Sequence, residues 1–76
     1  MMSLSRIEEL WAWIGITSEG DEGVLSAKMA GDIVPLIHIT RLGVEMQRAA
    51  AQQMADLGIE VRLVCFTNRT DLETLT

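Results

Sequence analysis

Two residues of this 76-residue chain have side chains suited to nucleophilic or metal chemistry, His38 and Cys65, each the only residue of its type. A catalytic histidine needs a hydroxyl or thiol beside it and an acid that orients its ring. Thr40 and Cys65 could supply the nucleophile, but a lone histidine at the end of an apolar run is more often a packed residue. A thiol in the middle of an apolar run behaves as a small hydrophobic side chain. The sequence therefore predicts no catalytic residue and no enzyme.

Metal and cofactor sites are not expected either. One cysteine cannot form an intrachain disulfide, and one cysteine with one histidine cannot supply the four ligands of a structural zinc site. Glu19, Asp21 and Glu22 lie close together but miss the alternating carboxylates and final glutamate of a calcium loop. Gly20 and Gly23 form no phosphate cradle, because their segment connects two strands and opens no helix. We expect a solvated acidic turn that binds no metal and no cofactor.

Four segments are predicted as the main secondary structure elements. Residues 10–17 are apolar on both faces, which is typical of a central strand that is covered on both sides. Residues 24–30 alternate apolar with polar side chains and form the second strand of a hairpin. Residues 40–57 carry apolar side chains at spacings of three and four, so they predict a helix with Thr40 as N-cap and Gly58 as its stop. Residues 59–67 form the third strand.

Two further segments have weaker signals. Pro35 cannot donate to a strand ladder, so residues 33–39 are predicted as a tucked, extended connection. The sequence Thr70-Asp71-Leu72-Glu73 is a capping box and predicts a short C-terminal helical turn.

These elements predict one α+β domain, residues 1–76, with the order ββαβ. A right-handed crossover after the hairpin places the third strand beside the first, so the predicted sheet has three antiparallel strands in the order 2-1-3. One long helix then covers one face of the sheet.

The pair Trp11 and Trp13 raises the question of what covers the other face. If the helix packs on the side of Leu10, Ala12, Ile14 and Ile16, the tryptophans need a different cover. Residues 33–39 with the C-terminal turn are one candidate, and a second molecule is the other. Tryptophan is enriched at the centres of interfaces, which favours the second molecule. The predicted interface residues, which are expected to share one face, are Trp11, Trp13, Val64 and Phe66.

Composition restricts the classes of function and partner. A net charge of -5 opposes binding to a phosphate backbone, so no nucleic acid partner is expected. No stretch of about 18 uncharged apolar residues is present, so no membrane partner is expected. The N-terminal residues lack the basic and apolar regions of a secretory signal, which predicts a cytoplasmic protein. A core of this size gives about 3 to 5 kcal/mol, so the chain is expected to be marginal unless it oligomerises.

Several short motifs in the chain are shared with a recognisable group of proteins. They are Trp13, Glu22-Gly23, Pro35-Leu36-Ile37, Arg62-Leu63-Val64 and Phe66-Thr67-Asn68-Arg69. In these motifs the chain resembles short bacterial and prophage-encoded proteins that have no assigned activity. The resemblance implies at most a small accessory role and assigns no functional residue.

Three hypotheses for function remain open. The first is a non-enzymatic interaction protein that forms a homodimer through a sheet face or a strand edge. The second is an acidic, phage-derived inhibitor or regulator, in which Glu19, Asp21 and Glu22 bind a basic protein surface. The third is a small ligand-binding domain or enzyme with a pocket near His38 and Arg41.

Overall fold

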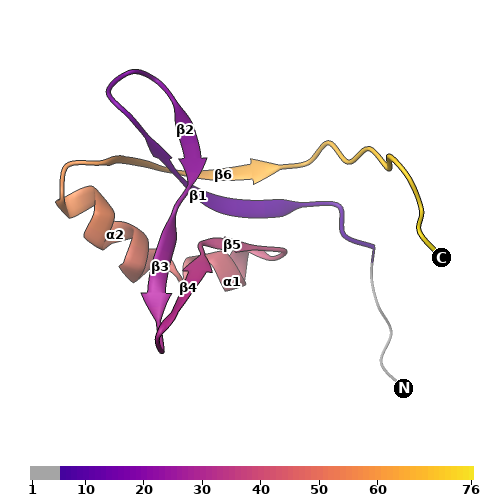
Figure 1. The fold of residues 1–76 in the computed structure, drawn as a ribbon, viewed down its shortest axis with the longest axis horizontal. Coiled ribbons are helices and arrows are strands. Elements are labelled where there is room, and N and C mark those ends of the chain that lie inside the picture. The colour runs from indigo at the N-terminus through magenta and orange to yellow at the C-terminus, as the bar shows by residue number, and fades with distance from the viewer. Residues whose placement is uncertain (1–5) are drawn as a thin grey trace.

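The strand that carries the two tryptophans lies at the centre of the sheet, as predicted. In the computed structural model, which describes residues 6–76, β1 (Leu10–Ile16) pairs antiparallel along its whole length with β6 (Glu60–Phe66) (Figure 1). The other edge of β1 pairs with β5 (Ile37–His38) and with β2 (Glu22–Val24). The protein is α+β with antiparallel strands, but its main sheet has four strands rather than the predicted three. The first five residues, which the targeting prediction also used, lie outside the described range.

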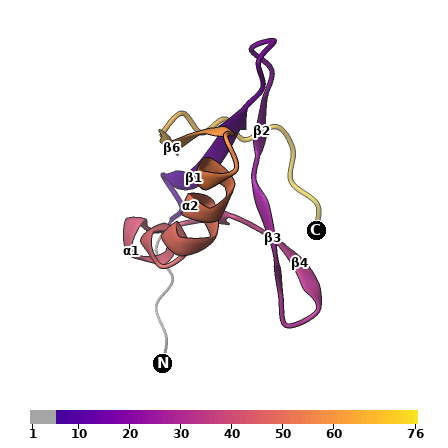
Figure 2. The ribbon, with the colours of Figure 1, turned by 90° about the vertical axis from the view of Figure 1, so that its left-hand side faces the viewer.

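A two-stranded arm branches from this sheet. The predicted strand 24–30 divides at Leu25 into β2 and β3 (Ser26–Met29), and β3 pairs with β4 (Asp32–Pro35) (Figures 1 and 2). At the branch, the Leu25 N–H donates to the Trp13 carbonyl at 2.9 Å, and the Trp13 N–H donates to the Leu36 carbonyl at 3.0 Å. Leu25 directly follows β2, and Leu36 directly precedes β5. Because Trp13 bonds both residues, β2 and β5 meet end to end on one edge of β1. The residues between them leave the main sheet as the arm, β3–β4.

The segment 33–39 is extended, as predicted, but the prediction that it is only a connection was wrong, because it contributes to two strands. Its first part belongs to β4, and Ile37 and His38 pair with Ala12 and Trp11 of β1. Pro35 ends β4 in a two-stranded sheet, where a strand without one N–H donor is tolerated.

The predicted single helix is divided into α1 (Arg41–Glu45) and α2 (Arg48–Asp56). The Val44 carbonyl accepts the indole N–H of Trp13 at 2.9 Å and the Gln47 N–H at 3.1 Å. In a continuous helix this carbonyl would accept the N–H of Arg48. A side chain that occupies a carbonyl of the ladder bends a helix, so Trp13 explains the break.

The ends of the helical region follow the sequence. Thr40 is the N-cap of α1, and its Oγ1 accepts the Gly43 N–H at 3.0 Å. Gly58, with a φ of +96°, follows the end of α2 and donates its N–H to the Ala55 carbonyl at 2.9 Å. Both predictions are confirmed.

The predicted C-terminal helical turn is absent, because residues 67–76 contain no helix and are exposed. Leu72 and Leu75, which were expected to pack on the body, are 89% and 87% exposed. One turn of helix fixes several dihedral angles for few hydrogen bonds, so a capping box alone does not stabilise it without a packing surface.

Both helices lie on the tryptophan face of the sheet, which reverses the predicted placement (Figures 1 and 2). Trp13 is 6% exposed and packs against Leu36, Val44 and Ala51. A buried indole needs an acceptor for its N–H, and the helix supplies one at Val44. The small side chain of Ala51 leaves room for the large ring. The aliphatic side chains of β1 carry no polar group that needs a partner, so they lie on the face away from the helices.

The strand register places the predicted interface residues on two different faces. Trp13 lies opposite Leu63, and Trp11 lies opposite Cys65. Val64 and Phe66 therefore lie on the face away from the helices, and the prediction that they share a face with the tryptophans was wrong. An offset of one residue between two strands is sufficient to exchange faces.

We expect Trp13→Phe to lower the free energy of unfolding by about 1 to 2 kcal/mol, because it removes the buried donor to Val44 and part of the core volume. Trp11→Phe is the matched control, since its indole N–H donates to Glu9 at 3.2 Å in an exposed position. Urea unfolding followed by circular dichroism measures both. Equal losses for the two variants would contradict the role assigned to Trp13.

A second expectation concerns Glu45, which accepts hydrogen bonds from Arg48 at 2.7 and 3.0 Å and holds that guanidinium 4.9 Å above the Trp13 ring. The hydrogen bond from Arg48 lowers the pKa of Glu45 below its ordinary 4.5, although partial burial acts in the opposite direction. A lowered pKa stabilises the folded state above that ordinary value and loses its effect as the pH falls below it.

The stability difference between the wild type and Glu45→Gln should therefore shrink as the pH falls from neutrality through about 4. Urea unfolding at a series of pH values measures this difference. A difference that stays constant over the range would show that the ion pair contributes nothing.

Candidate functional site

The face of the main sheet opposite the helices forms a continuous apolar surface, which we call the open face. All four strands of the sheet contribute to it. Its apolar residues, placed by the strand register, are Leu10, Ala12, Ile14, Ile16, Val24, Ile37, Val64 and Phe66.

Burial across the open face falls from its centre to its rim. Ala12 and Ile14, on the central strand, are 0% and 6% exposed, because neighbouring strands flank them. Leu10, Val24 and Phe66 are 39%, 44% and 51% exposed. Both helices lie on the other side of the sheet in both views (Figures 1 and 2). The exposed apolar side chains therefore lie at the rim of the open face, around a buried centre, and exposed apolar side chains that lie outside the core are candidates for contact with a partner.

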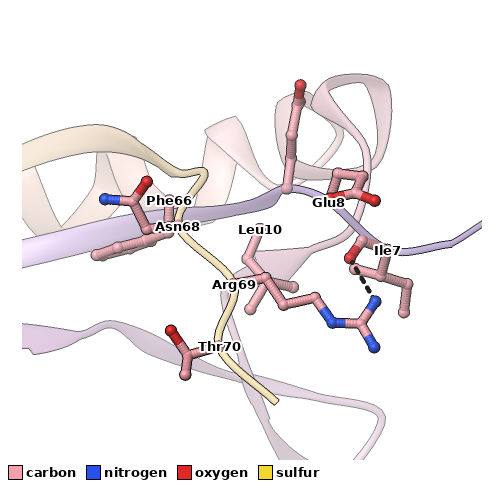
Figure 3. A pocket seen from close by; sticks show the side chains of 8 residues that line it. Ile7, Glu8, Leu10, Phe66, Asn68, Arg69 and Thr70 are labelled. Atoms are coloured by element: carbon pink, nitrogen blue, oxygen red, sulfur yellow. Dashed lines mark hydrogen bonds between the residues drawn. The ribbon is translucent and has the colours of Figure 1, made fainter.

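One end of the open face widens into a hollow of 610 Å³ (Figure 3). Leu10 and Phe66, which are opposite each other in the register, contribute its apolar lining together with Ile7. Arg69 reaches across the hollow, and its Nη1 donates to the Ile7 carbonyl at 3.1 Å. Its Nε also pairs with Asp71 at 2.7 Å. These bonds hold the segments before β1 and after β6 beside each other, so the hollow extends the open face.

Charge on this side of the molecule gathers at the opposite end. The tip of the β1–β2 hairpin rises on the side of the sheet away from the helices, and its side chains are exposed (Figures 1 and 2). It carries Glu19, Asp21 and Glu22. On β6, Glu60 and Arg62 pair with each other at 3.0 Å on the open face. The open face therefore has an apolar centre and one strongly acidic end.

The structure divides the four predicted interface residues into accessible and inaccessible ones. Val64 is half-buried and Phe66 is 51% exposed on the open face. Trp13 lies under the helices, so no partner can contact it without displacing them. Trp11 is half-buried beneath Arg41, whose guanidinium carbon lies 5.4 Å from the centre of its ring.

Six apolar residues of the open face were not among the predicted interface residues: Leu10, Ala12, Ile14, Ile16, Val24 and Ile37. Leu10 alternates with Trp11 along β1, so it shares its face with Ala12 and Ile14. That alternation was visible in the sequence, but this face had been assigned to the helix. The Ile37 position depends on the pairing of β5 with β1, which no local pattern indicates.

His38 organises the start of α1. Its Nδ1 accepts the Thr40 backbone N–H at 3.2 Å, and Thr40 in turn caps the helix through Gly43. The hollow nearest to this segment, of 270 Å³, is lined by Ile39 and Thr40 together with residues 6–9. His38 does not contribute to that lining. The geometry therefore supports a structural role for His38.

Cys65 is half-buried on the tryptophan face, and its Sγ lies 4.0 Å from Glu9 Oε2. Partial burial, and then the charge of Glu9, raise the pKa of the thiol above its ordinary value. A raised pKa lowers the thiolate fraction at neutral pH, and the thiolate is the reactive form. The environment of Cys65 is therefore that of a packed side chain.

Residues 6–76 contain neither a cluster of metal ligands nor a membrane-spanning helix. No three His, Cys, Asp or Glu side chains in this range are grouped as a metal site requires. Within the same range, no helix has the length and apolar character needed to cross a bilayer.

A second apolar groove, of 520 Å³, runs between the arm and α2. Met29 lies on the arm side, and Met46 and Met54 lie on the helix side. Gln47 also lines it, and its buried Oε1 has no hydrogen-bond partner within the described chain. The groove separates the arm from the helices along most of β3.

We expect Gly43→Ala to destabilise the fold by about 1 to 3 kcal/mol, because an added Cβ would overlap the His38 ring. His38→Ala removes the obstacle, so the double variant should lose less than the sum of the two single variants. Thermal unfolding of the four proteins measures this. Simple additivity would show that the ring and the helix do not contact each other.

Comparison of the chain with protein-family models, with curated proteins and with solved structures gives no match.

Proposed function

We propose that this protein is a non-enzymatic interaction protein that self-associates through the open face. The observation that carries the proposal is the imbalance between buried and exposed apolar side chains. Six residues in the described chain form the buried apolar set, while twelve large apolar residues are at least 38% exposed, and three of the twelve, Leu10, Val24 and Phe66, lie on the open face. A core this small leaves a chain of 76 residues marginally stable on its own.

Surface area supports the same proposal. The protein exposes 6332 Å², whereas a compact protein of 8.4 kDa exposes about 4600 Å². The excess includes the extended segment 67–76 and the arm. This open shape leaves the apolar side chains at the rim of the open face, Leu10, Val24 and Phe66, in contact with solvent, where a partner could cover them.

A second copy is the occupant that fits the open face best. Two sheets that pack face to face about 10 Å apart form an ordinary two-layer core, with side chains of both inner faces interdigitated. The apolar centre of the open face, around Ile14 and Val64, supplies one half of such a core. A partner that stabilises every folded chain must be present at the same concentration as the chain itself. A second copy of the chain meets this condition.

Electrostatics favours one orientation of the two copies. A two-fold axis along the strands would place one acidic hairpin tip over the other. An axis in the plane of the sheet and across the strands places the tips at opposite ends of the assembly. Since like charges in contact are costly, the proposed dimer uses the second axis.

A second candidate function is the regulator that binds a basic protein surface. The observation in its favour is the hairpin tip, where Glu19, Asp21 and Glu22 project from the body and form no ion pair within residues 6–76. A protein that stays monomeric would favour this candidate over self-association.

Light scattering after gel filtration tests the proposal. We expect the wild type to have at least twice its 8.4 kDa chain mass, and Phe66→Asp to shift the mass toward 8.4 kDa. The wild-type melting temperature should also rise with protein concentration, because association stabilises the folded state by mass action.

Leu72→Asp is the matched control, because Leu72 is exposed but lies in the C-terminal segment, away from the open face. It should retain the wild-type mass. A wild type that remains at 8.4 kDa at high micromolar concentration, with a melting temperature independent of concentration, would refute self-association.

A further inference from the structure

The outer edge of β6 carries backbone N–H and carbonyl groups that pair with no other strand in residues 6–76. β6 pairs with β1 through seven consecutive residue pairs without a bulge, from Leu10 opposite Phe66 to Ile16 opposite Glu60. Figure 2 shows β6 on the opposite side of β1 from β2. In residues 6–76, no strand pairs with the other edge of β6. Seven residues of regular strand are therefore available to another chain.

The peptide groups on this edge can be identified from the bonds of Trp13. Its N–H donates to Leu36 and its carbonyl accepts from Leu25, so the odd-numbered residues of β1 point to the edge away from β6. Peptide groups alternate along a strand, so the even-numbered residues of β1 bond β6. Their register partners on β6 are also even-numbered. The outward peptide groups belong to Val61, Leu63 and Cys65.

The edge also lacks the features that usually prevent strand addition. Natural edge strands are protected by proline, lysine, bulges or short length. β6, with the sequence EVRLVCF, has no proline, no lysine and an unbroken register, and its two charged side chains, Glu60 and Arg62, pair with each other at 3.0 Å. Such an edge is a template for strand pairing.

We propose that β6 pairs antiparallel with β6 of a second copy, with Leu63 opposite Leu63 of that copy. A two-fold axis through this pair places Val61 opposite Cys65 on both sides. The outward N–H and carbonyl groups of Val61, Leu63 and Cys65, six on each copy, then find partners across the axis.

The neighbouring registers are less favourable. Centring the pair on Arg62 places Arg62 beside its own copy, which costs repulsion. Centring it on Val61 requires the N–H of Ile59, which already donates to the Met54 carbonyl at 3.3 Å. Centring it on Val64 leaves Val61 beyond the paired strand. Only the Leu63 register uses the whole edge without like charges in contact.

This edge contact goes beyond the open-face dimer and does not depend on it. The axis of the edge contact is perpendicular to the sheet, whereas the axis of the face contact lies in the plane of the sheet. Two perpendicular two-fold axes generate a tetramer with D2 symmetry when both contacts form. The edge contact alone generates a dimer.

A cysteine crosslink tests the register. In the proposed pairing, Val61→Cys introduces a thiol opposite native Cys65 of the second copy, at a Cα separation of about 5.5 Å. That separation allows a disulfide. Oxidation by dissolved oxygen with a copper–phenanthroline catalyst should give a covalent dimer of twice 8.4 kDa on a denaturing gel.

Two controls define the outcome. The wild type should give no covalent dimer, because the two Cys65 residues lie four positions apart along the strands, about 13 Å. The double variant Val61→Cys with Cys65→Ser should also give none. A crosslink in the double variant would overturn the Leu63 register.

The edge contact and the face contact fail in different ways. No crosslink in Val61→Cys, for a protein that light scattering shows to be associated and that Phe66→Asp dissociates, would overturn the edge contact and leave the open-face dimer standing. A crosslink in Val61→Cys together with an unchanged mass for Val24→Asp, which changes the open face but lies outside β6, would support the edge contact and remove the face contact.

Discussion

The hydrogen bond from the Trp13 indole to the Val44 carbonyl is the interaction on which the rest of the structure depends. It joins the central strand to the helical region across 31 residues of sequence, and it divides that region into two helices. The ring of the same residue fills the core, and its peptide groups hold the two strands from which the arm diverges. One side chain and its backbone therefore determine the helix placement, the helix break and the branch of the sheet.

The open face is a consequence of the placement of both helices on the Trp13 side of the sheet. A chain of 76 residues has enough helix to cover one side of a four-stranded sheet, and Trp13 fixes that side. The aliphatic residues of β1 then have no cover from the helices, although Ile14 is as buried as Trp13 by its strand neighbours. Exposed side chains at the rim, such as Phe66, are the remaining apolar surface. In this chain the packing of its own core leaves that rim exposed, and this is the surface that the proposed association would bury.

Local patterns in the sequence predicted the parts of the fold that depend on neighbouring residues. The apolar side chains on both faces of residues 10–17 indicated a central strand, Thr40 indicated the helix start and Gly58 indicated its end. The face that the helices cover could not be read in this way, because both faces of β1 are apolar and the decision rests on a contact 31 residues away. Two of the four predicted interface residues, Val64 and Phe66, lie on the open face. Their separation from the tryptophans depends on the register between β1 and β6, which is a tertiary property that no local pattern indicates.

The thin core also connects folding to association. The helices pack on the sheet through a few side chains, with Val44 and Ala51 against Trp13. The core that they form therefore lies on one side of the sheet. Burying the open face against another sheet would add a second layer without any change in the first, since Ile14 and Ala12 are already ordered by their neighbours. Preorganisation of this kind lowers the entropic cost of binding. Association would then raise the stability of β1 itself, the strand that pairs with β2, β5 and β6.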